Sequence, residues 1–201
     1  YTLLACSIEG VKGVAFEPVP STFRRLVDNV RLSHLDGRVR CVNMAVGELP
    51  GIVRFTTDGD TTNHAVADGE ISPHVVSVPV ITLDDALQED GVPDVMKIDV
   101  EGYETLVLRG GVKTFQHQSL KAVVMELNGA GARYGFDEQN ILDMMRDWGF
   151  CAYTYDPFSR TIAELGGKNT ESGNTLFLRH LPTCRERLRN APKVCVNGVL
   201  F

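Results

Sequence analysis

The fold is decided by residues 95–104, which read VMKIDVEGYE. The stretch opens with an apolar run that suits a buried strand, and it ends in two carboxylates, a glycine and a further glutamate. A helical pattern begins just after Gly102, so the chain is predicted to turn sharply from a strand into a helix. In open α/β sheets, ligands bind at the carboxyl ends of the strands, which is where Asp99 and Glu101 fall. We therefore expect a functional site at this turn.

Strands and helices alternate along the chain before and after this stretch. Apolar, β-branched runs predict further strands at residues 11–16, 39–46, 51–56, 75–81 and 121–128. Apolar residues at helical spacing follow the first of these strands from Pro20 onward. A strand, a helix and a second strand in succession imply parallel strands joined by a crossover helix.

The carboxyl-terminal part departs from this alternation. Strands are predicted at residues 151–155 and 175–178, with a long polar loop and no clear helix between them. Two strands without a crossover helix usually pair antiparallel. The predicted fold is therefore α/β and Rossmann-like, with a doubly wound, mostly parallel sheet that ends in an antiparallel hairpin. A short basic helix and tail follow at residues 182–201, and their arginines are more simply a solvated face than a binding patch.

Length and composition are those of one domain with a sizeable core, since 43% of the 201 residues are hydrophobic. The chain starts at Tyr1, already inside an apolar stretch. We therefore expect residues 1–201 to be a single domain that is truncated at its N-terminus and lacks the first strand of its sheet. The alternative is an N-terminal helix that is frayed.

The net charge and the cysteine pattern argue against several classes of protein. A net charge of −6 argues against binding nucleic acid through its phosphates. No apolar run reaches membrane-spanning length. The five cysteines are scattered without a C-x-x-C pair, which fits a reduced protein better than a disulfide framework or a zinc site. We predict a cytoplasmic protein that binds neither nucleic acid nor membranes.

Polar groups also follow two earlier strands. Glu17 comes directly after the strand at residues 11–16, and a carboxylate there can accept two hydrogen bonds from a ribose diol. The alternative is a surface glutamate before the proline turn at Pro18. The turn at residues 43–47 would lie beside an adenine in the same geometry, with Asn43 offering an amide and Ala45 little bulk.

Lys97 raises the question of how a cation is accommodated in a buried strand. Side chains alternate along a strand, so Lys97 shares a face with Asp99. An unpaired buried ammonium is costly, and Asp99 or Glu126 on a neighbouring strand is the expected partner. The oxygens of Asp99, Glu126 and Asn128 could instead hold a Mg²⁺ ion. A Lys97-centred ion-pair network is the simpler explanation, and we assign no metal.

Four motifs in order resemble the FkbM-type methyltransferase family. They are residues 15–20 (AFEPVP), 43–47 (NMAVG) with Gly51, 81–85 (ITLDD), and 97–104 (KIDVEGYE) with 108–110 (LRG). The resemblance implies a class I methyltransferase fold and an S-adenosylmethionine-dependent O-methyltransferase that acts on hydroxyl groups of small molecules such as sugars or polyketides. The glycine-rich turn that the family places before a segment resembling residues 1–5 is absent, in keeping with the expected truncation.

The resemblance also implies roles for individual residues. The cofactor-binding residues it implies are Glu17, Pro18, Asn43, Ala45 and Asp99. The proposed reaction is in-line displacement, with Asp99 on the polar or sulfonium side of the donor and Glu101 as base or acceptor-positioning group. His64 and His74 are rival bases. Glu101 and Glu104 also have a structural explanation, because carboxylates in the first turn of a helix favour its macrodipole, and for Glu104 that explanation suffices.

Two other functions remain open. A nicotinamide-dependent oxidoreductase domain would continue with parallel crossovers, so a parallel strand at residues 175–178 would favour it. The other is a non-catalytic domain that retains the scaffold. For a methyltransferase, acceptor choice would lie in the loops at residues 58–74 and 129–134. The sequence identifies neither the acceptor nor the oligomeric state.

Overall fold

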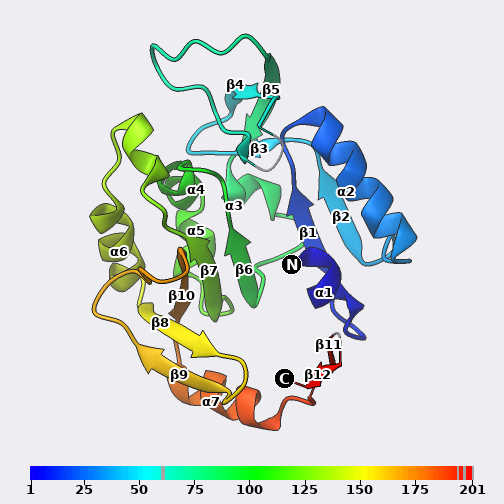
Figure 1. Cartoon of the computed structure of the whole chain (residues 1–201), viewed down its shortest axis with the longest axis vertical. Coiled ribbons are helices and arrows are strands. Elements are labelled where there is room, and N and C mark those ends of the chain that lie inside the picture. Colours follow the sequence, from blue (N-terminus) through cyan, green and yellow to red (C-terminus); the bar gives the residue numbers. More distant parts are fainter. Residues whose placement is uncertain (60–61, 194, 197, 201) are drawn as a thin grey trace. The chain divides into compact units, whose positions relative to one another are not determined.

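The computed structural model describes residues 1–59, 62–193, 195, 196 and 198–200 (Figure 1). The chain divides into two compact units, whose ranges are Tyr1–Gly91 with Thr105–Thr114, and Val92–Glu104 with Phe115–Phe201. Each unit is described by itself. Helices α4 (Glu104–Arg109) and α5 (Val112–Gln116) contain the points at which the chain passes between them. That residues 1–201 form one domain stays a prediction.

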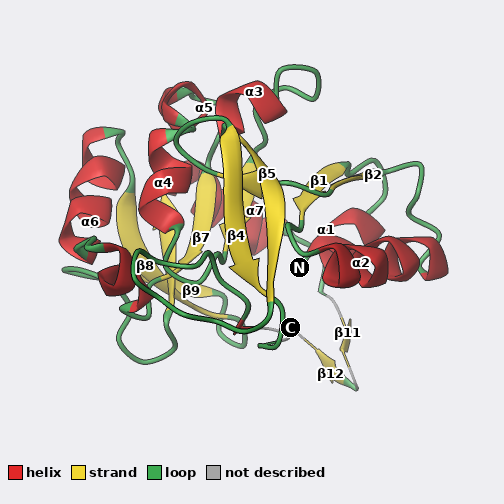
Figure 2. Ribbon diagram, turned by 90° about the horizontal axis from the view of Figure 1, so that it is seen from above, coloured by secondary structure: helices red, strands yellow, loops and turns green. Residues whose placement is uncertain are grey.

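The first unit contains the predicted strand–helix–strand segment. Strands β1 (Gly13–Phe16) and β2 (Val39–Val42) pair in parallel, and α2 (Pro20–Leu32) joins them and lies alongside them (Figure 2). The helix begins at Pro20, where a missing N–H removes no intrahelical hydrogen bond. Helix α1 (Thr2–Ser7) precedes β1. The apolar cluster among these elements consists of Cys6, Ala15, Val30, Leu35 and Val39.

A second sheet in this unit has the strand order β3–β5–β4. Strands β4 (Gly51–Thr56) and β5 (Val75–Ile81), both predicted as strands, pair antiparallel, and β3 (Ala45–Val46) runs parallel to β5. The prediction of one strand over residues 39–46 is wrong, because β2 and β3 belong to different sheets. The break falls at Asn43, whose side chain bonds to the backbone beyond the end of β1.

The next helix of this unit begins with a side-chain cap. The hydroxyl of Thr82 accepts the Asp85 N–H (3.1 Å) and donates to the Asp85 carboxylate (2.7 Å), and α3 (Leu83–Ala86) follows. A side chain that satisfies an otherwise unpaired N–H fixes where a helix starts.

The second unit is built on a five-stranded sheet with the order β6–β7–β10–β8–β9. Its strands are β6 (Val95–Ile98), β7 (Ala122–Glu126), β8 (Cys151–Asp156), β9 (Thr161–Glu164) and β10 (Asn174–Leu178). Strands β6 and β7 are parallel, whereas β10 is antiparallel to both β7 and β8 (Figure 1). The predicted antiparallel pairing of the last two strands is therefore confirmed, and the parallel final strand expected of a nicotinamide-binding domain is not found.

Two features of this sheet differ from the prediction. Strand β9 was expected to be loop, and β10 lies between β7 and β8 instead of adding a hairpin at the edge. The chain thus has a mixed α/β fold with parallel and antiparallel strand pairs. The Rossmann-like, doubly wound arrangement of the whole chain stays a prediction.

Buried side chains from the strands and helices of the second unit form its core. The largest of them are Phe115, Leu120, Val123, Met125, Met145, Phe150 and Phe177. Helix α6 (Glu138–Asp147) contributes Met145, and it begins after Asp137, whose side chain accepts the Gln139 N–H (2.9 Å).

The predicted basic helix is α7 (Leu181–Asn190), which buries no residue. After it, β11 (Cys195–Val196) and β12 (Val199–Leu200) pair antiparallel. Residues 194, 197 and 201 of the predicted tail lie outside the described residues. Within the described part of the chain, we find no helix with the length and apolar character needed to cross a membrane.

Candidate active site

Lys97 and Asp99 lie together at the carboxyl end of β6. The Lys97 Nζ is 3.1 Å from Asp99 Oδ2, and the Lys97 side chain is only 15% exposed. The same Nζ donates to Asn174 Oδ1 (2.9 Å) and to the Ile98 carbonyl (3.2 Å). Oxygens from β6 and β10 therefore surround the ammonium, and the predicted pairing of Lys97 with Asp99 is confirmed.

Glu126 joins this pair from the end of β7, where the strand register places it opposite Asn174. A hydrogen bond to Asp99, together with burial, raises the pKa of Glu126 to about 7. Burial alone would raise the pKa of Asp99, but the Glu126 hydrogen bond and the Lys97 charge outweigh it and hold that pKa below its usual range. Below about pH 7, Glu126 thus carries a proton that it shares with an ionised Asp99, and above that pH it is ionised.

Glu101 completes a group of three carboxylates. One oxygen each of Asp99, Glu101 and Glu126 lies within 4.8 Å of the others. Asn128, which the alternative joins to Asp99 and Glu126 as a Mg²⁺ ligand, stays a predicted ligand only. Its Oδ1 accepts the Ala130 N–H (3.0 Å) of its own loop. Because the Lys97 ammonium already contacts Asp99, we assign no metal to these carboxylates.

The turn that carries Glu101 is not part of the following helix. Helix α4 begins at Glu104, so the interpretation of Glu101 as a first-turn residue is wrong. Glu101 and Gly102 both have positive φ angles, +53° and +101°, and the Tyr103 N–H donates to the Val100 carbonyl (3.2 Å). Positive φ at both central residues is the pattern of a type I′ turn, which is unusual for glutamate.

Replacing Glu126 with glutamine should change how stability depends on pH. A glutamic acid whose pKa is raised in the folded state stabilises the fold below its ordinary value of 4.5, and that stability is lost as pH rises through about 7. The lowered pKa of Asp99 acts in a different range, below its ordinary value of 3.8. We expect urea midpoints measured between about pH 5 and pH 7 to fall less in Glu126→Gln than in the unmodified chain. Equal slopes would contradict the shared proton.

In the first unit, Glu17 ends β1 as predicted. Its Oε1 accepts the Val19 N–H (2.8 Å). Burial raises the pKa of Glu17, and the Val19 N–H and the Arg25 charge oppose that rise. The Asn43 amide donates to the carbonyls of Glu17 (2.8 Å) and Pro18 (2.9 Å). Three of the predicted cofactor-binding residues, Glu17, Pro18 and Asn43, are therefore brought together.

Ala45 is the fourth predicted cofactor-binding residue in this unit. It lies in β3, where it pairs with Val80, and its side chain is 3% exposed. Its contact with a cofactor stays a prediction.

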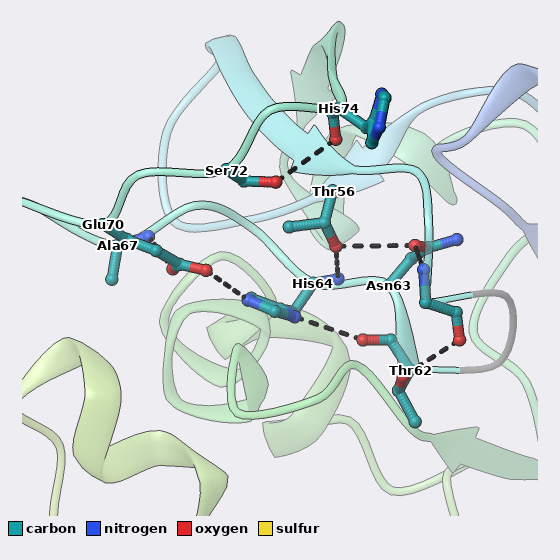
Figure 3. A network of polar contacts seen from close by, with 9 residues as sticks. Thr56, Thr62, Asn63, His64, Ala67, Glu70, Ser72 and His74 are labelled. Atoms are coloured by element: carbon teal, nitrogen blue, oxygen red, sulfur yellow. Dashed lines mark hydrogen bonds and ion pairs between the residues drawn. The ribbon is translucent and has the colours of Figure 1, made fainter.

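The His64 side chain contacts two other residues of the loop between β4 and β5 (Figure 3). Its Nε2 is 2.8 Å from Glu70 Oε1, and its Nδ1 is 3.1 Å from the Thr62 carbonyl. The Glu70 carboxylate also accepts the Ala67 N–H (2.9 Å), so it ties two points of the loop together. His74 is exposed. Catalytic roles for the two histidines stay predictions, and residues 60–61 of this predicted acceptor loop lie outside the described residues.

Asn174 is the site residue that the sequence did not reveal. It is the first residue of β10 and contacts Lys97 across 77 positions of sequence. A polar residue at the start of an otherwise apolar strand was the available signal.

Comparisons with known proteins agree on a family. Residues 2–151 match the family model described as the methyltransferase FkbM domain. The hexuronic acid methyltransferase AglP of Haloferax volcanii is 29% identical over 139 residues, which are 66% of this chain and 52% of that protein. This chain thus spans about half the length of that curated relative.

A solved structure is also similar. The crystal structure of the FkbM methyltransferase from Methylobacillus flagellatus superposes with a TM-score of 0.50 and 14% identity, over 83% of this chain and 36% of the other. At this identity the likeness concerns the fold alone. The family model, which covers well over half of the residues, decides the assignment: the chain belongs to the FkbM methyltransferase domain family.

Proposed function

We propose that this chain is the catalytic part of an S-adenosylmethionine-dependent methyltransferase that methylates a hydroxyl group of a small molecule. The observation that carries the proposal is the Glu17 carboxylate at the carboxyl end of β1, fixed by the Val19 N–H. Membership of the family supports methyl transfer. The parallel pairs β1–β2 and β6–β7 and the reversed β10 support a Rossmann-like, doubly wound fold.

The first unit fits the adenosine part of such a donor. Each carboxylate oxygen can accept two hydrogen bonds, so Oε1 of Glu17 can hold the Val19 N–H and still accept from a ribose hydroxyl. Asn43 fixes the backbone of Glu17 and Pro18 beside it. We assign Glu17 to the ribose, and Pro18, Asn43 and Ala45 to its surroundings and the adenine.

The second unit supplies charge and a proton acceptor. When bound, S-adenosylmethionine supplies a methyl group on a sulfonium, which is already a strong electrophile. The protein must align the acceptor, worth up to roughly 7–11 kcal/mol, and remove its proton. Asp99, kept ionised beside Lys97, is assigned to the polar side of the donor, and Glu101 to the base or acceptor-positioning role. Glu126, with a pKa of about 7, is a second candidate base, because a base works best near the operating pH.

The acceptor is proposed to be a sugar or a similar polyhydroxylated compound. The relative AglP is a hexuronic acid methyltransferase by its printed name. Glucuronic acid glycosides are therefore the first acceptors to assay, with the matching glucosides as controls that lack the carboxylate. A methyl ether in the product would support hydroxyl methylation, and a methyl ester would contradict it.

Replacing Glu17 with glutamine should weaken cofactor binding. Hydrogen bonds to a charged group contribute about 1.5–3 kcal/mol, so we expect the Kd of S-adenosylhomocysteine to rise about tenfold or more. The measurement is calorimetric titration of the protein, with the exposed Glu9→Gln as the matched control. Absence of binding by the unmodified protein would sink the proposed function, whereas equal affinity in Glu17→Gln would remove the role of Glu17 alone.

The compartment and partners are proposals as well. Cys6, Cys41, Cys151 and Cys184 are free thiols, which supports a reducing compartment such as the cytoplasm. That the protein binds neither nucleic acid nor membranes stays a prediction from its acidic composition.

A further inference from the structure

Glu104 is a buried carboxylate directly after the turn that carries Glu101. We propose that Glu104 is a positioning residue, whose carboxylate holds this turn in the conformation that brings Glu101 beside Asp99. The significance of that position for methyl transfer rests on the proposed function. The positioning itself is a property of the ligand-free protein.

The hydrogen bonds of Glu104 run back to the turn. Its Oε1 accepts the N–H of Gly102 (3.2 Å) and lies 3.4 Å from the N–H of Val100. Glu104 is 5% exposed, and no ion pair to it occurs among the described residues. A carboxylate is costly to bury: burial raises the pKa of Glu104, and the hydrogen bonds from backbone N–H groups oppose that rise. The macrodipole of α4 alone would leave the side chain free to point to solvent, so it does not explain this burial.

The turn needs such support because its backbone is strained. Glu101 has a φ angle of +53°, a region that side chains with a Cβ rarely adopt outside special turns. Strained residues persist when the surrounding structure holds them, and they are concentrated at functional sites. The N–H groups that Glu104 accepts flank Glu101 on both sides, at Val100 and Gly102.

The opposite side of the turn is fixed by the loop after β7. A Cβ added at Gly102 would lie 2.6 Å from the carbonyl carbon and oxygen of Ala130, so the two backbones are in close contact. Ala130 begins the short helix η2 (Ala130–Tyr134), and the ring of Tyr103 packs edge-on against Tyr134 at 5.4 Å. One side of the turn thus packs against η2. The hydrogen bonds to Glu104 then hold the backbone of Val100 and Glu101 in place.

The position of Glu101 has an electrostatic consequence that can be measured. Glu101 is among the negative charges that raise the pKa of Glu126, after the hydrogen bond to Asp99 and burial. If the turn relaxes and the Glu101 carboxylate moves away, the pKa of Glu126 must fall. Removal of the Glu104 charge would by itself change the pKa values of the neighbouring carboxyl groups. The decisive comparison is therefore between two variants that both lack this charge.

The test compares Glu104→Ala with Glu104→Gln in the full-length protein without ligand. The glutamine side-chain oxygen can accept the same two N–H groups, whereas alanine cannot. We expect amide hydrogen exchange at Val100 and Gly102 to be about tenfold faster or more in Glu104→Ala, and to be restored in Glu104→Gln. We also expect carboxyl NMR titration to place the pKa of Glu126 lower in Glu104→Ala than in Glu104→Gln.

A double-mutant cycle with Glu101 completes the design. If Glu104 acts through Glu101, its effect on the pKa of Glu126 should disappear once the Glu101 carboxylate is removed. In the Glu101→Ala background, Glu104→Ala should therefore lower the pKa of Glu126 no more than Glu104→Gln does. If Glu104→Ala does not fold, Glu104→Asn replaces it, since its shorter side chain also lacks the charge and does not reach the two N–H groups. Unchanged exchange at both amides, or equal loss in Glu104→Gln, would overturn the inference. Because none of these measurements uses S-adenosylhomocysteine, failure of the proposed function would appear separately, as absence of its binding.

Discussion

Replacing Gly110 with alanine lowers the free energy of unfolding by about 3 kcal/mol or more, at the upper end of what overpacking usually costs. A Cβ at Gly110 would lie 1.9 Å from the carbonyl oxygen of Gly47 and 2.9 Å from its carbonyl carbon. Both are backbone atoms, so no side-chain rotation relieves the clash. The carbonyl of Gly110 also accepts the Asp84 N–H (3.0 Å), so any shift disturbs a second contact.

Urea unfolding followed by circular dichroism measures this effect, and Gly51→Ala in the same unit is the control. Gly51 lies in β4, and a Cβ there would meet nothing within 4 Å. We expect Gly51→Ala to stay within about 0.5 kcal/mol of the unmodified chain, as surface substitutions usually do. If Gly110→Ala is as stable as this control, the result contradicts the close contact between the backbones of Gly110 and Gly47.

Local patterns predicted the parts of the site that depend on one strand at a time. Alternation along β6 places Lys97 and Asp99 on one face whatever surrounds the strand, and the structure confirms their ion pair. The apolar run before Glu17 likewise predicted where β1 ends. These assignments needed no knowledge of which strands are neighbours.

Contacts that depend on strand order could not be read from the sequence. Asn174 reaches Lys97 because β10 lies between β7 and β8, an order that neither strand encodes by itself. Strand β9 was missed for a related reason. It is the edge strand of the sheet and is mostly exposed, so it lacks the apolar alternation by which strands are recognised.

The turn after β6 shows how packing can override local preference. The sequence predicted a sharp turn between strand and helix here, but glutamate has no preference for positive φ, so residues 99–103 did not predict the conformation of Glu101. The close contact of Gly102 with η2 and the hydrogen bonds to Glu104 decide that conformation. Both come from residues outside the two central positions of the turn.

Replacing Arg179 with methionine lowers the free energy of unfolding by about 3–5 kcal/mol. Arg179 is 4% exposed at the end of β10. Its Nη1 donates to the His117 carbonyl (3.0 Å), its Nη2 donates to the Phe115 carbonyl, and its guanidinium lies 3.9 Å from the centre of the Phe150 ring. Hydrogen bonds to a charged group contribute about 1.5–3 kcal/mol each, and stacking on an aromatic ring about 0.5–2 kcal/mol.

The opposite outcome for Arg179 has a physical basis, which makes the test informative. Burial lowers the pKa of this guanidinium, Nε has no hydrogen-bond partner among the described residues, and buried charges replaced by apolar groups sometimes leave a protein more stable. Here, however, methionine would remove the Arg179 donors from the carbonyls of Phe115 and His117, and would leave the latter only the Leu120 N–H (3.3 Å). The free energy of unfolding of Arg179→Lys should lie between those of the unmodified chain and Arg179→Met, because an ammonium cannot reproduce the planar fork of the guanidinium.

The control is Arg185→Met on the exposed face of α7, for which we expect the free energy of unfolding to change by no more than about 0.5 kcal/mol. If Arg179→Met matches that control, the fork does not stabilise the end of α5, and burial of the charge offsets all that its hydrogen bonds contribute.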